Sequence, residues 1–392
     1  MITVEEALSL VEAAKVSKAK VIEMPLLAAN GWVLAETIYS PMDMPPFPQS
    51  AMDGYAIHYV AHQSTYKLIG EIAAGESVQQ ELIAGEAARI FTGAPVPSSA
   101  NMVIRQEDAQ ALDGKVIFTQ IPKLQANIRP EGEQIKKNAI ALHAGHLLQD
   151  GSIGFLASLG VEKVNVIPKP SIAIISTGNE LVEAGTPLKF GQIYESNVHM
   201  LQSALSLRNI VDVKTYHIKD DLKHTVDTLK FALERYDLII FSGGISVGDY
   251  DYVKEALTLN QVETLFYKVK QKPGKPLYFG KKGAAFIFGL PGNPAACLTG
   301  FYIYILPLIA KLSGKPFVGL SKSTAPLNHA FERKGDRALF LKAKVDQFGK
   351  VDILDGQSSA MLQAFANANA LVYVGLGQNK MVKGEDVVLY HL

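Results

Sequence analysis

Between residues 171 and 312, short apolar segments alternate with segments of helical periodicity, and this alternation limits the possible folds more than any other feature. Strands that alternate with helices predict a parallel, doubly wound α/β sheet. In such a sheet, ligands bind at the carboxyl ends of the strands. We expect strands at 171–176, 211–218, 238–241 and 263–269, helices at 197–207, 222–236, 252–259 and 294–312, and a hairpin of 277–279 with 284–288.

The flanking sequence has a different pattern. Thr3 and the acids that follow it predict a capped helix to about residue 19, and residues 40–50 form a proline-dense linker. Short strands broken by glycine and proline follow, helix returns at 140–160, and the tail is again β. The predicted fold class is therefore multidomain α/β plus β. The predicted domains are an N-terminal helical/linker domain (1–44 plus 138–168), a small β domain (45–137), a central doubly wound α/β domain (169–315) and a C-terminal β domain (316–392).

Composition limits the class of protein. The chain has 392 residues with 38 basic and 38 acidic side chains, and this neutral balance argues against a nucleic-acid partner. The single cysteine, Cys297, excludes an internal disulfide and fits a cytoplasmic location. The N-terminus carries acids where a signal peptide would carry bases. The apolar run 301–310 contains Pro307 and is too short to span a bilayer, so we expect no membrane association.

The loop after the predicted strand 238–241 is the strongest candidate for a site. Ser242, Gly243 and Gly244 connect the end of this strand to the start of the next predicted helix. At such a position several backbone N–H groups have no partner within the helix and point in the same direction, which forms a site for an anion. Asp249 and Asp251 follow, and acids beside a phosphate site usually require a cation, most simply Mg²⁺. A tight turn with surface acids is the alternative, but the neighbouring loops favour the anion site.

Two further loops follow predicted strands. In the segment 176–180, Gly178 permits a close backbone approach and Glu180 supplies an acid, although a simple N-cap turn explains both residues equally well. In the segment 289–294, Asn293 can cap a helix that Pro294 opens, which gives either a second anion site or an ordinary capped helix.

A lysine-rich segment, 268–276, surrounds a Pro-Gly-Lys-Pro turn. Alternation along a strand predicts that Lys268, Lys270 and Lys272 share one face. Three ammonium groups on one face suit an anion, and a solvated edge is the alternative.

Three other reactive residues, Cys297, His143 and His146, have no predicted functional role. Cys297 lies in the first turn of a predicted helix, where the helix dipole lowers the pKa of a thiol. We nevertheless interpret Cys297 as a small core residue rather than as a nucleophile. His143 and His146 lack acidic or cysteine neighbours and are interpreted as structural.

Taken together, these segments resemble the molybdopterin molybdenumtransferase family, which includes the gephyrin E domain. The resemblance spans nearly the whole chain in family order and rests on segments 45–56 (PPFPQSAMDGYA), 91–95 (FTGAP), 127–129 (NIR), 176–178 (STG), 191–197 (GQIYESN), 242–248 (SGGISVG), 272–276 (KPGKP) and 289–294 (GLPGNP).

The resemblance implies four domains, a homodimer and small-molecule substrates. In the implied reaction, molybdenum from molybdate enters adenylylated molybdopterin, the phosphoanhydride is hydrolysed and AMP leaves. Mg²⁺ is the implied cofactor, and the molybdopterin adenylyltransferase is a candidate partner. Asp53 and Thr92 of one subunit are expected to act with the α/β loops of the other.

Site residues follow from the same motif positions. The resemblance assigns catalytic roles to Asp53, Glu180, Asp220, Asp251, Lys268 and Lys272, with Glu180 and Asp251 as metal ligands. It assigns substrate binding to Thr92, Ser176, Thr177, Gly178, Ser242, Gly243, Gly244, Ser246, Gly248, Lys275, Pro291, Gly292, Asn293, Pro294, Arg337 and Ser359.

The sequence departs from the family pattern at three positions. Asn179 and Gln134 replace usual acids, and Leu339 replaces a Glu in the motif that reads Arg337 to Lys342 here. The alternative to an active enzyme is therefore a catalytically weakened paralogue that binds molybdopterin or acts as a scaffold. The remaining acids Glu180, Asp220 and Asp251 favour the enzyme, and the extra domains disfavour a third possibility, the adenylyltransferase itself.

Overall fold

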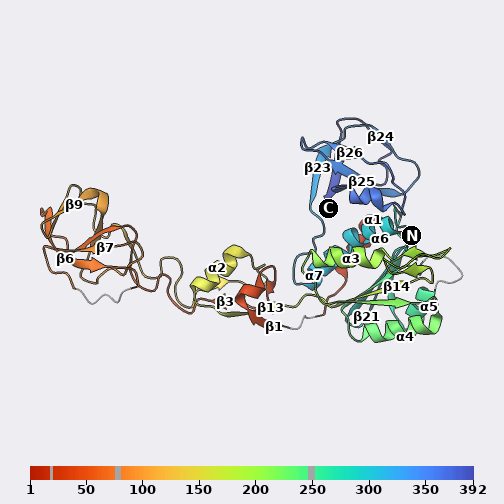
Figure 1. The fold of residues 1–392 in the computed structure, drawn as a ribbon, viewed down its shortest axis with the longest axis horizontal. Helices are drawn as coiled ribbons and strands as arrows, with labels where there is room; N and C mark the ends of the chain where they lie inside the picture. Colours follow the sequence, from red (N-terminus) through yellow and green to blue (C-terminus); the bar gives the residue numbers. More distant parts are fainter. Residues whose placement is uncertain (18–20, 76–80, 246–251) are drawn as a thin grey trace. The chain divides into compact units, whose positions relative to one another are not determined.

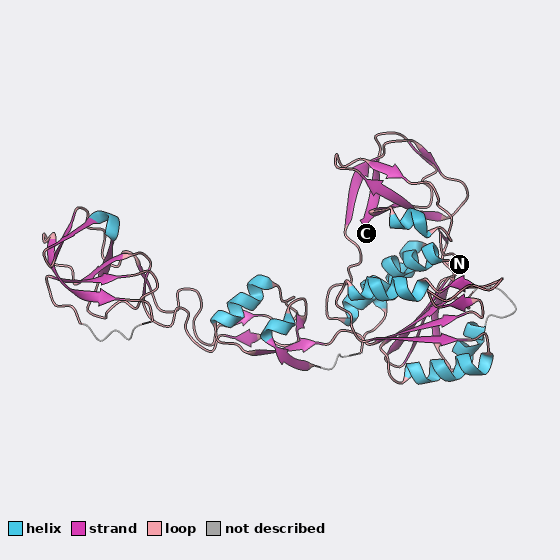
Figure 2. Ribbon diagram, in the orientation of Figure 1, coloured by secondary structure: helices cyan, strands magenta, loops and turns pink. Residues whose placement is uncertain are grey.

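The computed structural model describes residues 1–17, 21–75, 81–245 and 252–392, which form two compact units. One unit comprises Met1–Ile22 and Ile167–Leu392, and the other comprises Glu23–Val166. Both units are rich in strands, and Figure 2 shows that helices gather mainly beside the sheet of the first unit.

The first unit contains the predicted α/β sheet. Among the described residues its strand order is β17-β14-β18-β22-β21-β19, in which the first four strands are parallel and β21 runs antiparallel to β22 and to β19. The doubly wound α/β prediction is confirmed, and β21 with β22 forms the expected hairpin. The strands are β14 (Ile172–Thr177), β17 (Val213–Ile218), β18 (Leu238–Ser242), β19 (Glu263–Tyr267), β21 (Tyr278–Lys282) and β22 (Ala285–Leu290).

Helices cover both faces of this sheet (Figure 1). Alternate residues of β14 face opposite sides: Ile172 and Ile174 pack with one group of helices, whereas Ala173 and Ile175 pack with the other. The first group comprises α1 (Val4–Ala13), α3 (Asn197–Ser206), α6 (Pro294–Gly300), the π-helical turn η3 (Phe301–Ile305) and α7 (Leu306–Leu312). The second group comprises α4 (Leu222–Leu233) and α5 (Tyr252–Leu259).

The helix from Pro294 to Leu312 corrects one expectation. It is 19 residues long with a mean hydropathy of 1.7, so by length and composition it could cross a membrane, in contrast to the shorter run read from the sequence. However, 83% of its apolar window is buried inside the protein, as in a core helix. The turn η3 ends two residues before Pro307, which lacks the N–H that a regular helix would use there.

Helix α1 begins with the predicted cap. The Glu6 amide donates to Thr3 Oγ1 (3.1 Å) and the Thr3 amide donates to Glu6 Oε2 (2.7 Å), which together form a capping box. Its apolar residues Val4, Ala7 and Val11 are buried in the same cluster as the α/β helices. The segment 1–22 thus belongs to the α/β unit, and the finer domain boundaries given above stay predictions.

The 23–166 unit is predominantly β. The sequence pattern predicted β structure for 45–137, but the flanking residues 23–44 and 138–166, which were expected to be helical or linker, also contain short strands. Among its described residues the largest sheet has the order β8-β5-β7-β6-β10-β9. The expected helix at 140–160 is shorter, because residues 140–142 pair as a strand. The elements are β1 (Ile22–Pro25), η1 (Leu26–Ala29), β2 (Val33–Leu34), β3 (Ile38–Tyr39), β4 (Gln49–Ser50), β5 (Gly54–Ile57), β6 (Thr65–Ile72), β7 (Glu86–Ile90), β8 (Met102–Arg105), η2 (Gln106–Asp108), β9 (Ala109–Leu112), β10 (Lys115–Phe118), β11 (Ile128–Arg129), β12 (Ile140–Leu142), α2 (Asp150–Ser158) and β13 (Lys163–Ile167).

The C-terminal residues form a second sheet within the first unit, with the order β20-β25-β27-β29-β23 and β26 paired to β25. Strand β20 comes from the lysine-rich segment, so this sheet joins that segment to the tail. The remaining elements are β15 (Leu181–Val182), β16 (Ile193–Tyr194), β20 (Gln271–Lys272), β23 (Lys322–Pro326), β24 (Phe331–Glu332), β25 (Ala338–Val345), β26 (Val351–Ile353), α8 (Leu362–Ala366), β27 (Ala370–Val374), β28 (Lys380–Met381) and β29 (Asp386–His391).

Candidate functional site

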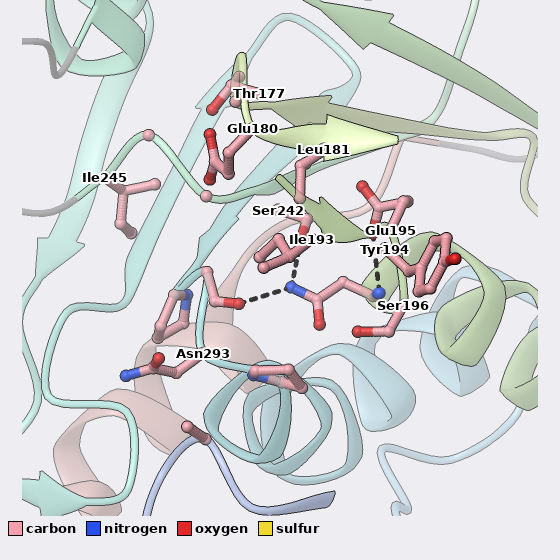
Figure 3. Close-up of a pocket in the computed structure, with 18 of the residues that line it drawn as sticks. Thr177, Glu180, Leu181, Ile193, Tyr194, Glu195, Ser196, Ser242, Ile245 and Asn293 are labelled. Atoms are coloured by element: carbon pink, nitrogen blue, oxygen red, sulfur yellow. Dashed lines mark hydrogen bonds between the residues drawn. The ribbon is translucent and has the colours of Figure 1, made fainter. Parts of the chain in front are cut away.

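A pocket of about 740 Å³ lies where the parallel strands β14, β18 and β22 end. Figure 3 shows Thr177 and Glu180 on one side of it and Asn293 on the other. This position agrees with the rule for ligand sites in open α/β sheets. Its lining residues are Thr177, Gly178, Glu180, Leu181, Ile193, Tyr194, Glu195, Ser196, Asn197, Asp220, Ser242, Gly243, Gly244, Ile245, Pro276, Pro291, Gly292, Asn293, Pro294 and Ala360.

The two glycines after β18 are required by space and by backbone conformation. Gly243 and Gly244 adopt φ values of 90° and 65°, which side-chain-bearing residues rarely adopt. A Cβ on Gly244 would lie 2.8 Å from Thr177 Oγ1 and 2.7 Å from Val253 Cγ2. The loop after β18 is thus packed closely against the end of β14, with its backbone exposed to the pocket.

Asn197 ties these loops together. Its Nδ2 donates to Ser242 Oγ (2.9 Å) and to the Gly292 carbonyl (2.8 Å), which connects the ends of β18 and β22 (Figure 3). Glu195 Oε1 accepts from the amides of Asn197 (2.8 Å) and Val198 (3.1 Å) and so caps α3. Segment 191–197 is one of the segments on which the family resemblance rests, but no role was predicted for its residues. Their place in that segment is the only sequence signal that points to Glu195 and Asn197.

Two acids predicted for the site line the pocket. Glu180 follows β14 and Asp220 follows the neighbouring strand β17. Asp220 Oδ2 accepts a hydrogen bond from the Asn179 amide (3.3 Å), so the backbone of Asn179 positions that carboxylate. Among the described residues, no group of three or more His, Cys, Asp or Glu side chains could hold a metal ion.

The lysine-rich segment is arranged differently from the prediction. Strand β19 ends at Tyr267, and Lys268 adopts a φ of 69°, which breaks the extended backbone. Strand β20 then belongs to the other sheet, and Lys270 Nζ lies 3.3 Å from Asp336 Oδ2. The expectation that alternation places three lysines on one strand face is therefore wrong.

The pairing of β20 with β25 brings other predicted residues near one another. Lys272 is opposite Leu339, and Arg337 lies immediately before β25. Lys272 and Lys275 are exposed, and neither they nor Lys268 nor Arg337 line the pocket.

Ser359 lies beside the pocket rather than in its lining. Its Oγ accepts from Asn293 Nδ2 (2.9 Å), and its carbonyl accepts from the amides of Ala295 (3.0 Å) and Ala296 (3.3 Å). The first turn of α6 is therefore capped by a residue from the turn between β26 and α8.

Asp53 and Thr92 belong to the 23–166 unit and lie next to each other. Asp53 precedes β5 and Thr92 follows β7, and these two strands pair in the sheet. The Thr92 amide and hydroxyl each donate to Asp53 Oδ1 at 2.7 Å. The backbone hydrogen bond, followed by that from the hydroxyl, lowers the pKa of Asp53 below its ordinary value.

Some predicted residues lie below the pocket or outside the described residues. Ser176 is buried and contacts His217 Nδ1 through its hydroxyl (3.1 Å). Burial raises the pKa of Cys297 to about 12, so its thiol stays protonated, in agreement with the core interpretation. The predicted site residues Ser246, Gly248 and Asp251, with the neighbouring Asp249, lie outside the described residues.

The fold and the pocket define a multidomain α/β protein with a pocket at the carboxyl ends of its parallel strands. Three family descriptions match the chain: "MoeA N-terminal region (domain I and II)" over residues 2–160, "Probable molybdopterin binding domain" over 173–311 and "MoeA C-terminal region (domain IV)" over 324–392.

Relatives match over nearly the whole length. The molybdopterin molybdenumtransferase of Staphylococcus epidermidis is 34% identical, covering 99% of this chain and 95% of the relative. That of Haemophilus influenzae is 35% identical, covering 92% and 91%. The crystal structure of the molybdopterin biosynthesis MoeA protein from Pyrococcus horikoshii superposes with a TM-score of 0.83 at 30% identity, covering 100% of this chain and 99% of that one. The chain belongs to the molybdopterin molybdenumtransferase family.

Proposed function

We propose that this chain inserts molybdenum from molybdate into adenylylated molybdopterin, with hydrolysis of the phosphoanhydride and release of AMP, to give the molybdenum cofactor. The observation that carries the proposal is the pocket at the strand ends, which is lined by glycines from three loops and by the acids Glu180, Glu195 and Asp220. Glycine backbones accommodate phosphate groups, and acids are required when a cation accompanies them. The family to which the chain belongs supports the same reaction.

Mg²⁺ fits the acids that line the pocket. Proteins usually bind Mg²⁺ through one or two carboxylates, with substrate phosphates and water completing the coordination. Glu180 and Asp220 supply two such carboxylates, and Asp251 is the further candidate from the resemblance. When bound, the cation would polarise the phosphoanhydride. The backbone around Gly178, Gly243 and Gly292 would orient the phosphates.

Molybdate is the second substrate and carries two negative charges. We propose that Lys268, Lys272, Lys275 and Arg337 attract it, because the β20–β25 pairing gathers basic residues on one edge of the C-terminal sheet. Ser359 would contribute a hydroxyl group beside Asn293, which lines the pocket.

Further parts of the proposal concern the assembly. We propose a homodimer in which Asp53 and Thr92 of one subunit act with the pocket loops of the other, in a cytoplasmic protein that receives its substrate from a molybdopterin adenylyltransferase. The support is that Thr92 keeps Asp53 ionised at an exposed position, as a residue acting on a ligand requires.

The second candidate is a catalytically weakened paralogue that binds molybdopterin or serves as a scaffold. One observation favours it: Leu339, at the position of a usual acid, is buried in an apolar cluster of the C-terminal sheet. A carboxylate has thus been replaced by a packing residue, with no compensating acid among the described pocket residues beyond Glu180, Asp220 and Glu195.

Incubation with adenylylated molybdopterin, molybdate and Mg²⁺ separates the two candidates. The enzyme releases AMP over many turnovers and does so only with molybdate present. The paralogue binds adenylylated molybdopterin, measured by calorimetry, without releasing AMP.

A further inference from the structure

Lys342 is a buried lysine whose ammonium group donates to backbone carbonyls. It lies on β25 and is 1% exposed. Its Nζ donates to the carbonyls of Gly356 (2.7 Å), Ser358 (3.0 Å) and Met361 (3.3 Å). An ammonium has three N–H donors, so all of them are used within one short segment of the chain.

Gln357 joins the same segment to Lys342 through the backbone. Its Oε1 accepts from the Lys342 amide (3.0 Å), and its Nε2 donates to the carbonyls of Lys342 (2.8 Å) and Leu354 (2.7 Å). Segment 354–361 is therefore attached to one residue of β25 from both its main chain and its side chain.

This segment reaches the pocket. Ser359 caps the first turn of α6 through its carbonyl and contacts Asn293 through its hydroxyl. The next residue, Ala360, lines the pocket together with Asn293. Lys342 is thus hydrogen-bonded to the segment that supplies Ala360 to the pocket lining, although Lys342 does not line the pocket itself.

A buried charge without a carboxylate partner is unfavourable unless its hydrogen bonds are satisfied. Burial accordingly lowers the pKa of the Lys342 ammonium below its ordinary value. An apolar side chain would fill the same position in the sheet without the free-energy cost of burying a charge. Packing alone therefore does not explain why a lysine is present. The three backbone carbonyls explain its presence, because an apolar side chain could not donate hydrogen bonds to them.

We propose that Lys342 is a positioning residue that sets the affinity of the pocket for adenylylated molybdopterin by fixing segment 356–361. The identity of the substrate in this inference rests on the proposed function, whereas the attachment of segment 356–361 to Lys342 does not. Loss of the ammonium frees three carbonyls, loosens Ser359 from α6 and displaces Ala360 and Asn293 from the pocket wall.

The test compares Lys342→Met with Lys342→Arg, which keeps a cation with several N–H donors, and with Lys344→Met, an exposed lysine on the same strand. We expect Lys342→Met to raise the KM for adenylylated molybdopterin about tenfold with a smaller change in kcat, because positioning affects binding. Lys342→Arg should recover most of the loss, and Lys344→Met should match the wild type.

A merely structural role gives a different result. Partial unfolding would lower the maximal rate in proportion to the inactive fraction and leave KM unchanged. Hydrogen exchange adds a readout that needs no activity: the amides of Ala295 and Ala296, which donate to Ser359, should exchange faster in Lys342→Met and as in the wild type in Lys344→Met.

Should Lys342→Met fail to fold, Gln357→Leu removes the second attachment of the segment and is expected to change KM and amide exchange in the same direction. Unchanged KM and unchanged exchange at Ala295 and Ala296 in the folded variants would overturn the inference. If the wild type itself releases no AMP, the proposed function fails, while amide exchange still decides the role of Lys342.

Discussion

Thr92 stabilises the ionised form of the Asp53 carboxylate. The residue is exposed, yet the amide and the hydroxyl of Thr92 both donate to the same oxygen, Oδ1. These hydrogen bonds stabilise the ionised form and lower the pKa of Asp53. The second carboxylate oxygen receives neither of these bonds, so it is the one available to a ligand.

Thr92→Val tests this arrangement because it keeps the backbone hydrogen bond and removes only that of the hydroxyl. We expect the pKa of Asp53 to rise toward its ordinary value, since the ionised form loses a donor. Titration of the Asp53 carboxyl by carbon-13 NMR measures the change, and any acid limb of AMP release that depends on Asp53 should move to higher pH. Thr119→Val is the control, because its hydroxyl donates to a backbone carbonyl. A pKa that stays the same in Thr92→Val would contradict the account.

At the scale of elements, the core helix supports the lysine-rich segment through one buried contact. The Tyr304 hydroxyl, in the turn η3, donates to Gln271 Oε1 on β20, and both residues are fully buried. Gln271 Nε2 in turn donates to the Pro273 carbonyl (3.0 Å). The turn that carries Lys272 and Lys275 is thus joined to the interior of the α/β unit.

Tyr304→Phe should destabilise the protein by about 1–3 kcal/mol, the usual cost of leaving a buried acceptor such as Gln271 Oε1 without a donor. Urea unfolding of the purified variant measures this loss. The matched control is Tyr302→Phe in the same turn, because the Tyr302 ring faces Arg208 and its hydroxyl has no hydrogen-bond partner among the described residues. Equal stability of the two variants would show that the contact contributes nothing.

An element could be predicted when residues near one another in the sequence determine its structure, and could not be predicted when contacts between distant segments determine it. The apolar runs at 171–176 and 238–241 predicted β14 and β18 closely, because strands buried on both faces need continuous apolar sequence. The positive φ of Lys268 and the pairing of Gln271 with Ala338 were not predictable, since they arise from contacts between distant segments. The glycine loops were predictable from the local sequence, because their glycines directly follow predicted strands, whereas the role of Asn197 depends on loops that meet only in the folded chain.

At the scale of the whole molecule, the candidate residues are divided between two units. Asp53 and Thr92 belong to the 23–166 unit, and the pocket belongs to the other. In the proposed dimer, each site would combine residues of the 23–166 unit of one subunit with the pocket of the other. A two-fold assembly would then contain two equivalent composite sites.

Mixing two inactive variants, Asp53→Asn and Glu180→Gln, tests the composite site. In a mixed dimer, one site carries both defects and the other carries neither. Random exchange makes about half of the dimers mixed, so about a quarter of the wild-type activity should return. Subunit exchange is verified by mass spectrometry of differently tagged chains. Continued inactivity after verified exchange would mean that each site is built within one subunit.

Glu180 is the residue at which to test whether molybdenum insertion takes place in the pocket at the ends of β14, β18 and β22. Glu180→Gln removes one pocket carboxylate charge while keeping its shape, and Glu183→Gln changes an exposed acid outside the pocket. Steady-state AMP release from adenylylated molybdopterin, with molybdate and Mg²⁺, should fall by about 100-fold or more in Glu180→Gln, since even an outer partner of a metal ligand is typically worth 10–100-fold. Glu183→Gln should retain the wild-type rate. Wild-type AMP release by a folded Glu180→Gln variant would contradict the assignment of this pocket as the active site.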